Sequence, residues 1–211
     1  MQAQAVRNIL QASSGNQPYV VFGPPGTGKT TTIVEAVCHV VRASASARVL
    51  CCAPSNNAAD EFILRLRDTV PPSQMFRLNA PSRSKDALKE ELQGENPRRF
   101  LEYCCCEADA FEVPELAKLR SFRVVVSTCC SAALIRAAGV PEGHFTHVFV
   151  DEAGHALEPE LLIPLMAAKG ARPGGAVGGP EAAGARGAVR VCQEDGASAL
   201  RVPFAWLKVL T

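Results

Sequence analysis

The sequence predicts an α/β fold: a mostly parallel, doubly wound sheet with a small helical insertion. Short runs of consecutive apolar residues alternate along the chain with helix-prone stretches, and short turns join them. Continuous rather than alternating apolar runs are typical of strands covered on both faces, as in a parallel sheet. The regular alternation of strand and helix is typical of doubly wound α/β proteins. A chain of 211 residues is long enough for one domain of ordinary size.

The predicted elements follow one another in a simple order. Apolar, β-prone runs predict strands at residues 19–22, 48–53, 75–78, 123–127 and 147–150. The first of them, "YVVF", should be buried, and helices should follow the first two strands near 28–41 and 58–70. Residues 81–121 are charged and helix-prone, as in "SKDALKEELQ", which predicts a mostly helical insertion.

Bulk composition narrows the classes of function. Hydrophobic residues make up 47% and charged residues 20%, as in ordinary soluble globular proteins. The net charge of +1 predicts no polyanionic partner from bulk electrostatics, so any nucleic-acid binding must come from a local surface. The chain has no apolar run of membrane-spanning length and no secretory pattern at its N-terminus. We therefore expect no membrane partner and a cytoplasmic or nuclear location.

The nine cysteines are expected to be reduced, structural thiols. Most stand in adjacent groups, at 51–52, 104–106 and 129–130. Adjacent cysteines do not readily supply a tetrahedral zinc site, whose ligands are usually separated by about two to four residues. Positions 51–52 and 129–130 lie in or beside predicted strands, where a free thiol behaves as a small apolar residue.

The strongest local motif is "GPPGTGKT", which matches the phosphate-loop pattern G-x-x-x-x-G-K-[ST] between a strand and a helix. Glycines let consecutive backbone amides turn toward phosphate oxygens, and the helix N-terminus adds a favourable field. Lys29 is expected to reach the β- and γ-phosphates of ATP, and the Thr30 hydroxyl to bind Mg²⁺. The residues predicted to bind the nucleotide are Gly23, Pro24, Pro25, Gly26, Thr27, Gly28, Lys29 and Thr30.

Two adjacent acids, Asp151 and Glu152, follow the predicted strand 147–150. In phosphate-loop proteins an acid at the end of a neighbouring strand holds the magnesium ion, which is the role predicted for Asp151. Glu152 is then placed to orient or deprotonate the attacking water, a general-base task. Without the phosphate loop, two solvated acids capping the next helix would be the better interpretation. With it, we predict that Glu152 and Lys29 are catalytic.

Further segments discriminate between kinds of ATPase, because the loop and the acidic pair also resemble ring-forming AAA-type ATPases. They are "MQAQAVRNIL", "APSNNAAD", "FRLNAPSRS", "VVVSTCCSAALI" and "GHFTHVFVDEAGHALEPE". Together they resemble superfamily 1 RNA helicases of the nonsense-mediated-decay helicase group, and within it the Armitage/silencing-defective helicases. The resemblance covers about residues 2–166 in the family's motif order. It implies a RecA-like P-loop NTPase domain that is the first motor domain of an ATP-dependent RNA helicase.

The resemblance also implies roles for single residues and for partners. Gln2 matches the glutamine that reads the adenine ring, and two polar turns match those that contact single-stranded nucleic acid: Pro54, Ser55 and Asn56, then Ser127 and Thr128. Such turns can contact phosphate and sugar without reading sequence, although Pro, Ser and Asn also suit an ordinary strand-to-helix turn. ATP and Mg²⁺ are the implied cofactors and single-stranded RNA the implied partner. RNA-silencing or RNA-decay proteins, a monomeric state and cytoplasmic ribonucleoprotein granules are implied as well.

The resemblance ends near residue 166, and the chain is divided into a predicted motor domain, 1–168, and a tail, 169–211. Residues 170–187 hold seven glycines and five alanines, a composition unsuited to a packed strand or a stable helix. The family would continue with another strand, a Gly-Asp-x-x-Gln-Leu motif and a second motor domain. We expect that the tail arises from a frame change, a retained intron or a gene-model error and is poorly ordered. The chain alone is then expected to be nearly inactive.

Other functions stay open on the sequence alone. A DNA helicase of the same superfamily shares these motifs, and a AAA-type ATPase is disfavoured by the two polar turns. A truncated nucleotide-binding module without catalysis is a different class of answer. His39 is expected to be a helix-face residue, whereas His155, just after "DEAG", stands where it could sense the γ-phosphate.

Overall fold

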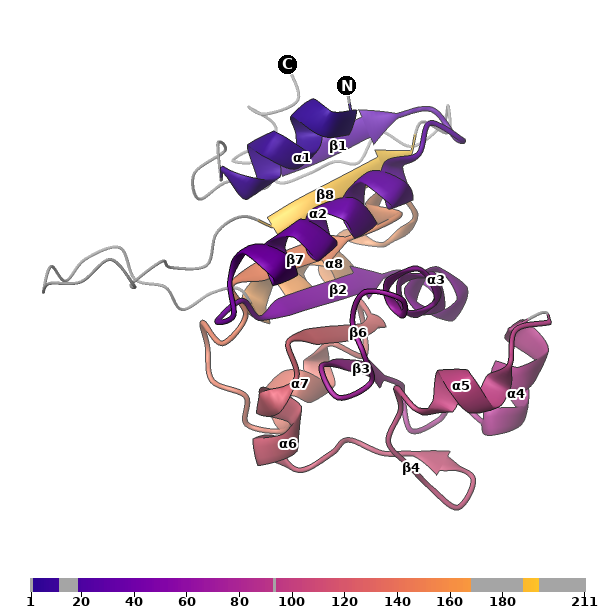
Figure 1. The fold of residues 1–211 in the computed structure, drawn as a ribbon. Helices are drawn as coiled ribbons and strands as arrows, with labels where there is room; N and C mark the ends of the chain where they lie inside the picture. The colour runs from indigo at the N-terminus through magenta and orange to yellow at the C-terminus, as the bar shows by residue number, and fades with distance from the viewer. Residues whose placement is uncertain (1, 12–18, 93, 168–187, 194–211) are drawn as a thin grey trace, which may run out of the picture.

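The computed structural model describes residues 2–11, 19–92, 94–167 and the backbone of 188–193. Its centre is a six-stranded parallel sheet with the strand order β1-β8-β7-β2-β6-β3 (Figure 1). The strands are β1 (Tyr19–Gly23), β2 (Val49–Ala53), β3 (Met75–Leu78), β6 (Val124–Thr128), β7 (His147–Val150) and β8 (Ala188–Gln193). The predicted strands are therefore all present, and β8 is an addition to them.

Helices lie on both sides of this sheet (Figure 1). They are α1 (Gln2–Leu10), α2 (Lys29–Ala43), α3 (Asn56–Leu66), α6 (Leu116–Ser121), α7 (Ala133–Ala137) and α8 (Glu158–Ala167), with a short 3₁₀ turn, η1 (Ala153–His155). The long helix α2 buries Ile33, Val37, Val40 and Val41, residues three or four apart that form one apolar stripe. That stripe is what holds the helix against the sheet.

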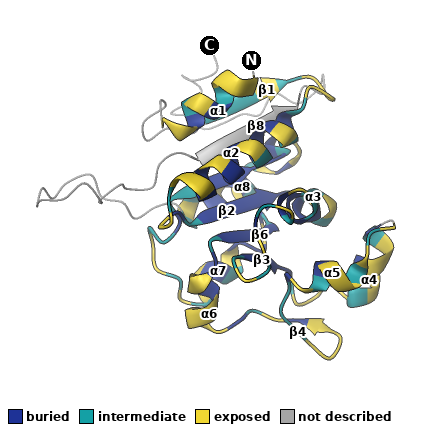
Figure 2. Cartoon of the chain, viewed as in Figure 1, coloured by how far each residue is buried: buried dark blue, intermediate teal, exposed yellow. Residues whose placement is uncertain are grey.

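The two faces of the sheet belong to two separate apolar cores. Val49 and Cys51 of β2 pack with α1, α2 and α3, whereas Leu50 and Cys52 of the same strand pack with α6, α7 and α8. Every residue of β2 is buried, as the dark central strands of Figure 2 show. Alternate side chains of a strand point to opposite faces, so a strand covered on both sides must be apolar throughout. The continuous apolar runs of the sequence have this physical origin.

The carboxyl ends of three neighbouring strands meet at one edge of the sheet. In register, Ala53 of β2 pairs with Thr128 of β6, and Cys52 pairs with Val150 of β7. Just beyond, the Asp151 amide donates to the Cys52 carbonyl over 2.9 Å. The polar turns and the acidic pair, far apart in the sequence, are therefore side by side. In open α/β sheets this edge is where ligands bind.

The predicted insertion, residues 81–121, contains helices and one small hairpin. Helices α4 (Lys85–Glu91) and α5 (Pro97–Leu101) project beside the sheet, and β4 (Cys106–Glu107) pairs with β5 (Ala110–Phe111) (Figure 1). The side chains of Ser84 and Asn96 accept from the first-turn amides of α4 and α5. The sequence predicted helices here but not the hairpin, because strands of two residues carry no periodic signal.

One prediction is corrected by this architecture. Strand β1 was expected to be buried, but it is the edge of the sheet, and Phe22 is 59% exposed. Strand β8 comes from the predicted tail, 169–211, and pairs with both β1 and β7. Because backbone hydrogen bonds make these pairings, the short β-prone run "AVRVCQ" can join the sheet despite the composition around it. The glycine-rich stretch 170–187 lies outside the described residues.

Candidate nucleotide and nucleic-acid site

The phosphate loop connects β1 to α2 and depends on glycine at two places. Gly26 and Gly28 have φ of 77° and 80°, in the left-handed region that favours glycine. A Cβ on Gly28 would also stand 2.4 Å from Nε2 of Gln2. The loop residues Pro24, Pro25, Gly26 and Thr27 are exposed, while Lys29 is buried at the first position of α2. The loop is thus an open turn with a cation at its base.

The side chains of the loop are fixed by backbone carbonyls. The Lys29 ammonium donates to the carbonyls of Gly23 at 2.6 Å and Pro24 at 2.8 Å. The Thr27 hydroxyl also donates to the Pro24 carbonyl, over 2.8 Å. From α1, Gln2 donates its side-chain amide to the carbonyl of Thr27 at 2.8 Å. The predicted adenine-reading residue therefore contacts the phosphate loop directly.

The acidic pair completes a cavity with this loop. Asp151 is 3% exposed, and its Oδ1 accepts from the Glu152 amide at 2.9 Å. Glu152 itself has φ of 51°, an uncommon and strained conformation for a residue other than glycine. The cavity has a volume of about 310 Å³ and is lined by Gly26, Gly28, Lys29, Thr30, Thr31, Arg65, Asp151 and Glu152. Folding thus brings together residues more than a hundred positions apart.

The donor set of this cavity suits a magnesium ion. Thr30 contributes a hydroxyl and Asp151 a carboxylate, both hard oxygen ligands. Mg²⁺ in nucleotide sites usually takes one or two protein ligands and completes its shell with phosphate and water. Within the described residues, no group of three or more His, Cys, Asp or Glu side chains could hold a metal ion. The oxygen pair therefore fits a metal that arrives with a nucleotide.

Arg65 lines the cavity although the sequence did not point to it. It lies near the end of α3, where its Nε donates to Glu61 at 2.6 Å and its Nη1 donates to the Thr31 hydroxyl at 3.0 Å. The spacing of Glu61 and Arg65 predicts only an exposed helical ion pair. The tertiary contact between α3 and the start of α2 is what places this second cation beside Lys29.

The turn after β2 combines a helix cap with a solvent-facing side. The hydroxyl of Ser55 accepts from the Ala58 amide at 3.2 Å and thereby caps α3. Pro54 and Asn56 are half-buried, and Ser55 is exposed. The alternative interpretation of this turn, an ordinary strand-to-helix connection, describes its local structure correctly.

The turn after β6 exposes one of its two predicted residues more than the other. Thr128 is half-buried, and its hydroxyl donates to the Ser131 hydroxyl at 2.8 Å. Ser127 is fully buried within β6, and its hydroxyl lies 3.5 Å from the Cys52 sulfur. The side chain of Ser127 is therefore turned away from solvent, and contact of this turn with nucleic acid stays a prediction. A residue inside a strand alternates in direction with its neighbour, and here the alternation turns Ser127 inward.

The histidines and cysteines follow the plainer interpretations. The Nε2 atom of His39 lies 3.1 Å from Oε1 of Glu35, one turn earlier on α2. His155 is exposed in η1 and does not line the phosphate-loop cavity. Cys51, Cys52 and Cys129 are buried free thiols. Burial raises the pKa of Cys52 to about 12, so this thiol stays protonated and unreactive at neutral pH.

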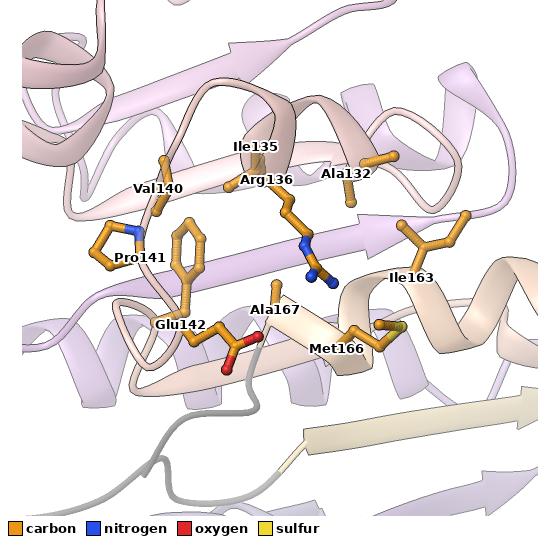
Figure 3. A pocket seen from close by; sticks show the side chains of 11 residues that line it. Ala132, Ile135, Arg136, Val140, Pro141, Glu142, Ile163, Met166 and Ala167 are labelled. Atoms are coloured by element: carbon orange, nitrogen blue, oxygen red, sulfur yellow. The ribbon is translucent and has the colours of Figure 1, made fainter.

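A second cavity, of about 200 Å³, lies between α7 and α8 and shares no residue with the first. Its lining is mainly apolar, including Ile135, Val140 and Ile163, and Arg136 and Glu142 are its charged residues (Figure 3). None of the predicted site residues lines it. No helix among the described residues is long and apolar enough to cross a membrane.

Comparison with known proteins shows the family to which this chain belongs. The sequence model of a family described as an AAA domain matches residues 1–103 and 112–171. The chain belongs to this family. Within the AAA-domain match, the break at 104–111 falls on the β4–β5 hairpin of the insertion.

Several relatives of this AAA-domain chain are named helicases. It is 46% identical over 166 residues to "RNA helicase Mov10l1" of Mus musculus, covering 78% of this chain and 13% of that protein. It is 38% identical over 168 residues to "Putative helicase MOV-10" of Gallus gallus, covering 78% and 16%. It is 36% identical over 185 residues to "Probable RNA helicase armi" of Drosophila melanogaster, covering 79% and 15%. The predicted membership in the Armitage group of superfamily 1 RNA helicases is confirmed.

A solved structure supports the fold. A nuclease-deletion mutant of the Type ISP restriction-modification enzyme LlaGI, in complex with a DNA substrate mimic, matches with a TM-score of 0.52 and 17% identity. The match covers 92% of this chain and 17% of that chain. At this identity the likeness concerns the fold alone, and the predicted RecA-like α/β architecture is confirmed.

Proposed function

We propose that the chain is the first motor domain of an ATP-dependent RNA helicase, which binds ATP with Mg²⁺ and contacts single-stranded RNA. One observation carries the proposal: a single cavity joins Lys29 and Thr30 of the phosphate loop to Asp151 and Glu152 of the acidic pair. The polar turns after β2 and β6 end at the same sheet edge. The names of the relatives, which are RNA helicases, favour RNA as the strand.

The proposal gives a chemical task to four residues of the cavity and to Gln2 beside it. The Lys29 ammonium leaves two uncharged carbonyls for the β- and γ-phosphates, which bind a cation more strongly. Thr30 and Asp151 hold the magnesium ion, which neutralises charge on the phosphates. Glu152 lies next to Asp151 and orients the attacking water, whose proton its carboxylate accepts. Gln2, beside the loop, contacts the adenine ring.

We propose further that this chain alone hydrolyses ATP slowly. Charge develops on the γ-phosphate in the transition state, and comparable enzymes stabilise it with an additional arginine. Among the described residues, Lys29 and Arg65 are the cations that line the cavity, and Arg65 is paired with Glu61. Loss of such an arginine lowers the rate by about 10³–10⁵-fold in comparable systems. Slow but measurable turnover is therefore expected.

The wider setting follows from the same family. The chain spans 13–16% of the length of these three relatives, and we assign translocation and unwinding to the intact helicase. We place the intact helicase in the cytoplasm, including ribonucleoprotein granules, as a monomer acting with RNA-silencing or RNA-decay proteins. The phosphate- and sugar-directed turns bind a strand without reading its bases.

The test measures ATP binding and ATP hydrolysis by the full chain with and without single-stranded RNA or single-stranded DNA. RNA-stimulated turnover that Lys29→Ala abolishes supports the proposal. Stimulation by DNA alone indicates a DNA helicase of the same superfamily. Nucleotide binding without turnover under any condition indicates a nucleotide-binding module. Absence of nucleotide binding would contradict all three.

A further inference from the structure

A buried cluster of charged side chains lies directly beneath the turn that follows β2. Its centre is Asp60 of α3, which accepts from Arg77 Nε at 2.6 Å and from Arg83 Nη2 at 2.6 Å. The side chains of Arg77, Arg83 and Asp60 are 0%, 3% and 5% exposed. Arg83 also donates to Glu91 of α4, so the charges balance within the cluster. The cluster thereby joins α3, β3 and the insertion.

Filling a core with buried charges is energetically costly. Removing charges from water costs several kcal/mol for each ion, and apolar residues of similar volume are often at least as stable. Burial lowers the pKa of Arg77, and the adjacent Asp60 carboxylate opposes that shift, so the guanidinium stays charged. A role in orienting neighbouring groups would explain why a charge stands at this position.

Arg77 has a contact that the rest of the cluster lacks. Its Nη2 donates to the side-chain oxygen of Asn56 at 3.1 Å, and Nη1 donates to the Leu78 carbonyl at 2.7 Å. Guanidinium groups only donate hydrogen bonds, so the oxygen and not the nitrogen of the Asn56 amide must face Arg77. This fixes the flip state of the amide. Its Nδ2 group is then directed away from the cluster.

The other end of the Asn56 amide is available to a ligand. Asn56 is half-buried at the first position of α3, next to the exposed Ser55. Within residues 2–11, 19–92 and 94–167, no group accepts a hydrogen bond from Asn56 Nδ2. Two N–H donors at a helix N-terminus suit a phosphate or sugar oxygen of a nucleic-acid strand.

We propose that Arg77 is a positioning residue for RNA binding: it holds the Asn56 amide with its oxygen inward and its two N–H donors toward the backbone of the bound strand. This rests on the proposed function, because the strand must pass over the turn after β2. Asp60 fixes the guanidinium plane, and Arg83 and Glu91 extend that support into the insertion. Arg77 itself does not touch the RNA.

The experiment measures binding of a fluorescein-labelled single-stranded oligouridylate to the full chain by anisotropy, at one fixed salt concentration. Asn56→Ala removes the donor and is expected to weaken binding about tenfold. Asn56→Asp keeps an acceptor for Arg77 but replaces the donors with a negative charge, so it should weaken binding more than Asn56→Ala. Arg77→Lys keeps the charge beside Asp60 but loses the planar fork, and should match Asn56→Ala.

A double-mutant cycle separates positioning from a general structural effect. If Arg77 acts through Asn56, Arg77→Lys causes no further loss of RNA affinity in the Asn56→Ala background. Arg83→Lys is the matched control, because Arg83 shares Asp60 but does not contact Asn56. It should lower stability and leave RNA affinity within about twofold of the wild type. ATP binding by every variant reports that the domain is folded.

Distinct outcomes would overturn the inference and the proposed function. Additive losses in the cycle, or wild-type affinity of Asn56→Asp, contradict the inference while leaving RNA binding by the domain intact. Failure of the wild-type chain to bind the oligouridylate contradicts both.

Discussion

The phosphate-loop cavity and the turn after β2 lie at one edge of the same sheet but are held in different ways. Around the phosphate loop, backbone conformation sets the geometry: two left-handed glycines, a strained Glu152 and a lysine hydrogen-bonded to carbonyls. Beneath the turn after β2, a buried cluster of opposite charges sets it. The first arrangement depends on backbone torsions and on single hydrogen bonds to the backbone. The second is locked, because separating buried charges is costly.

This contrast predicts that substitutions in the cavity and substitutions in the buried cluster will affect different measured properties. Substitutions around the cavity should reduce nucleotide binding or turnover and have a smaller effect on the free energy of unfolding. Substitutions in the cluster should lower stability first.

The largest effect is expected for Glu152→Gln, which removes the carboxylate that would accept the proton of the attacking water. RNA-stimulated ATP turnover, which is already slow in this chain, should fall by about 10²–10⁴-fold and so to background, while ATP affinity and the unfolding midpoint stay the same. The control is Glu107→Gln, which alters an exposed acid in the hairpin. Unchanged turnover in Glu152→Gln would remove Glu152 from the chemistry.

The next largest effect is expected for Asp60→Ala, which leaves Arg77 and Arg83 buried without their shared carboxylate. The free energy of unfolding should fall by about 3–5 kcal/mol, measured by urea denaturation. The control is Asp109→Ala, which removes an exposed acid of the insertion and should change the free energy of unfolding by less than about 0.5 kcal/mol. A loss as small as that of the control would show that the cluster is not what holds the turn.

Gly28→Ala tests whether backbone conformation governs the nucleotide side. At a φ of 80° an alanine costs about 1–2 kcal/mol, and its Cβ displaces the Gln2 amide, so ATP should bind about tenfold more weakly. Gly94→Ala is a close control, because Gly94 has φ of 93° and open space around it. It should lower stability to a similar extent and leave ATP affinity unchanged. If Gly28→Ala and Gly94→Ala bound ATP with equal affinity, the backbone conformation at Gly28 would not govern the phosphate-loop cavity.

The smallest effect is expected for Ser55→Ala, which removes the cap of α3. The free energy of unfolding should fall by about 1 kcal/mol, and Ser84→Ala, which removes the cap of α4, should cost the same. Only Ser55→Ala should weaken binding of single-stranded RNA, as measured by anisotropy. A similar loss of RNA affinity in both variants would indicate that the effect comes from stability rather than from the turn.

Much of this molecule could be predicted from its sequence, for identifiable reasons. Strands covered on both faces leave continuous apolar runs, and a phosphate loop needs glycines and Lys-Thr at fixed spacing, so both are visible locally. Three features were not visible. Ser127 is polar but buried, Arg65 looks like half of an exposed helical pair, and β8 follows a glycine-rich stretch. In each of them the partner that decides the role is distant in sequence.

The fold class, the position of the phosphate loop and the family follow from the amino-acid sequence alone. These depend on periodicity and on spacing within short segments, which the chain carries whatever it packs against. In contrast, the packing of the folded chain determines which strand lies at the edge, which polar residues face solvent and that Arg77 meets Asn56. Those features depend on the order and register of strands, and register places residues as far apart in sequence as Cys52 and Val150 at one sheet edge. The physical reason is that parallel strands align their carboxyl ends, so distant turns become neighbours only once the sheet has formed.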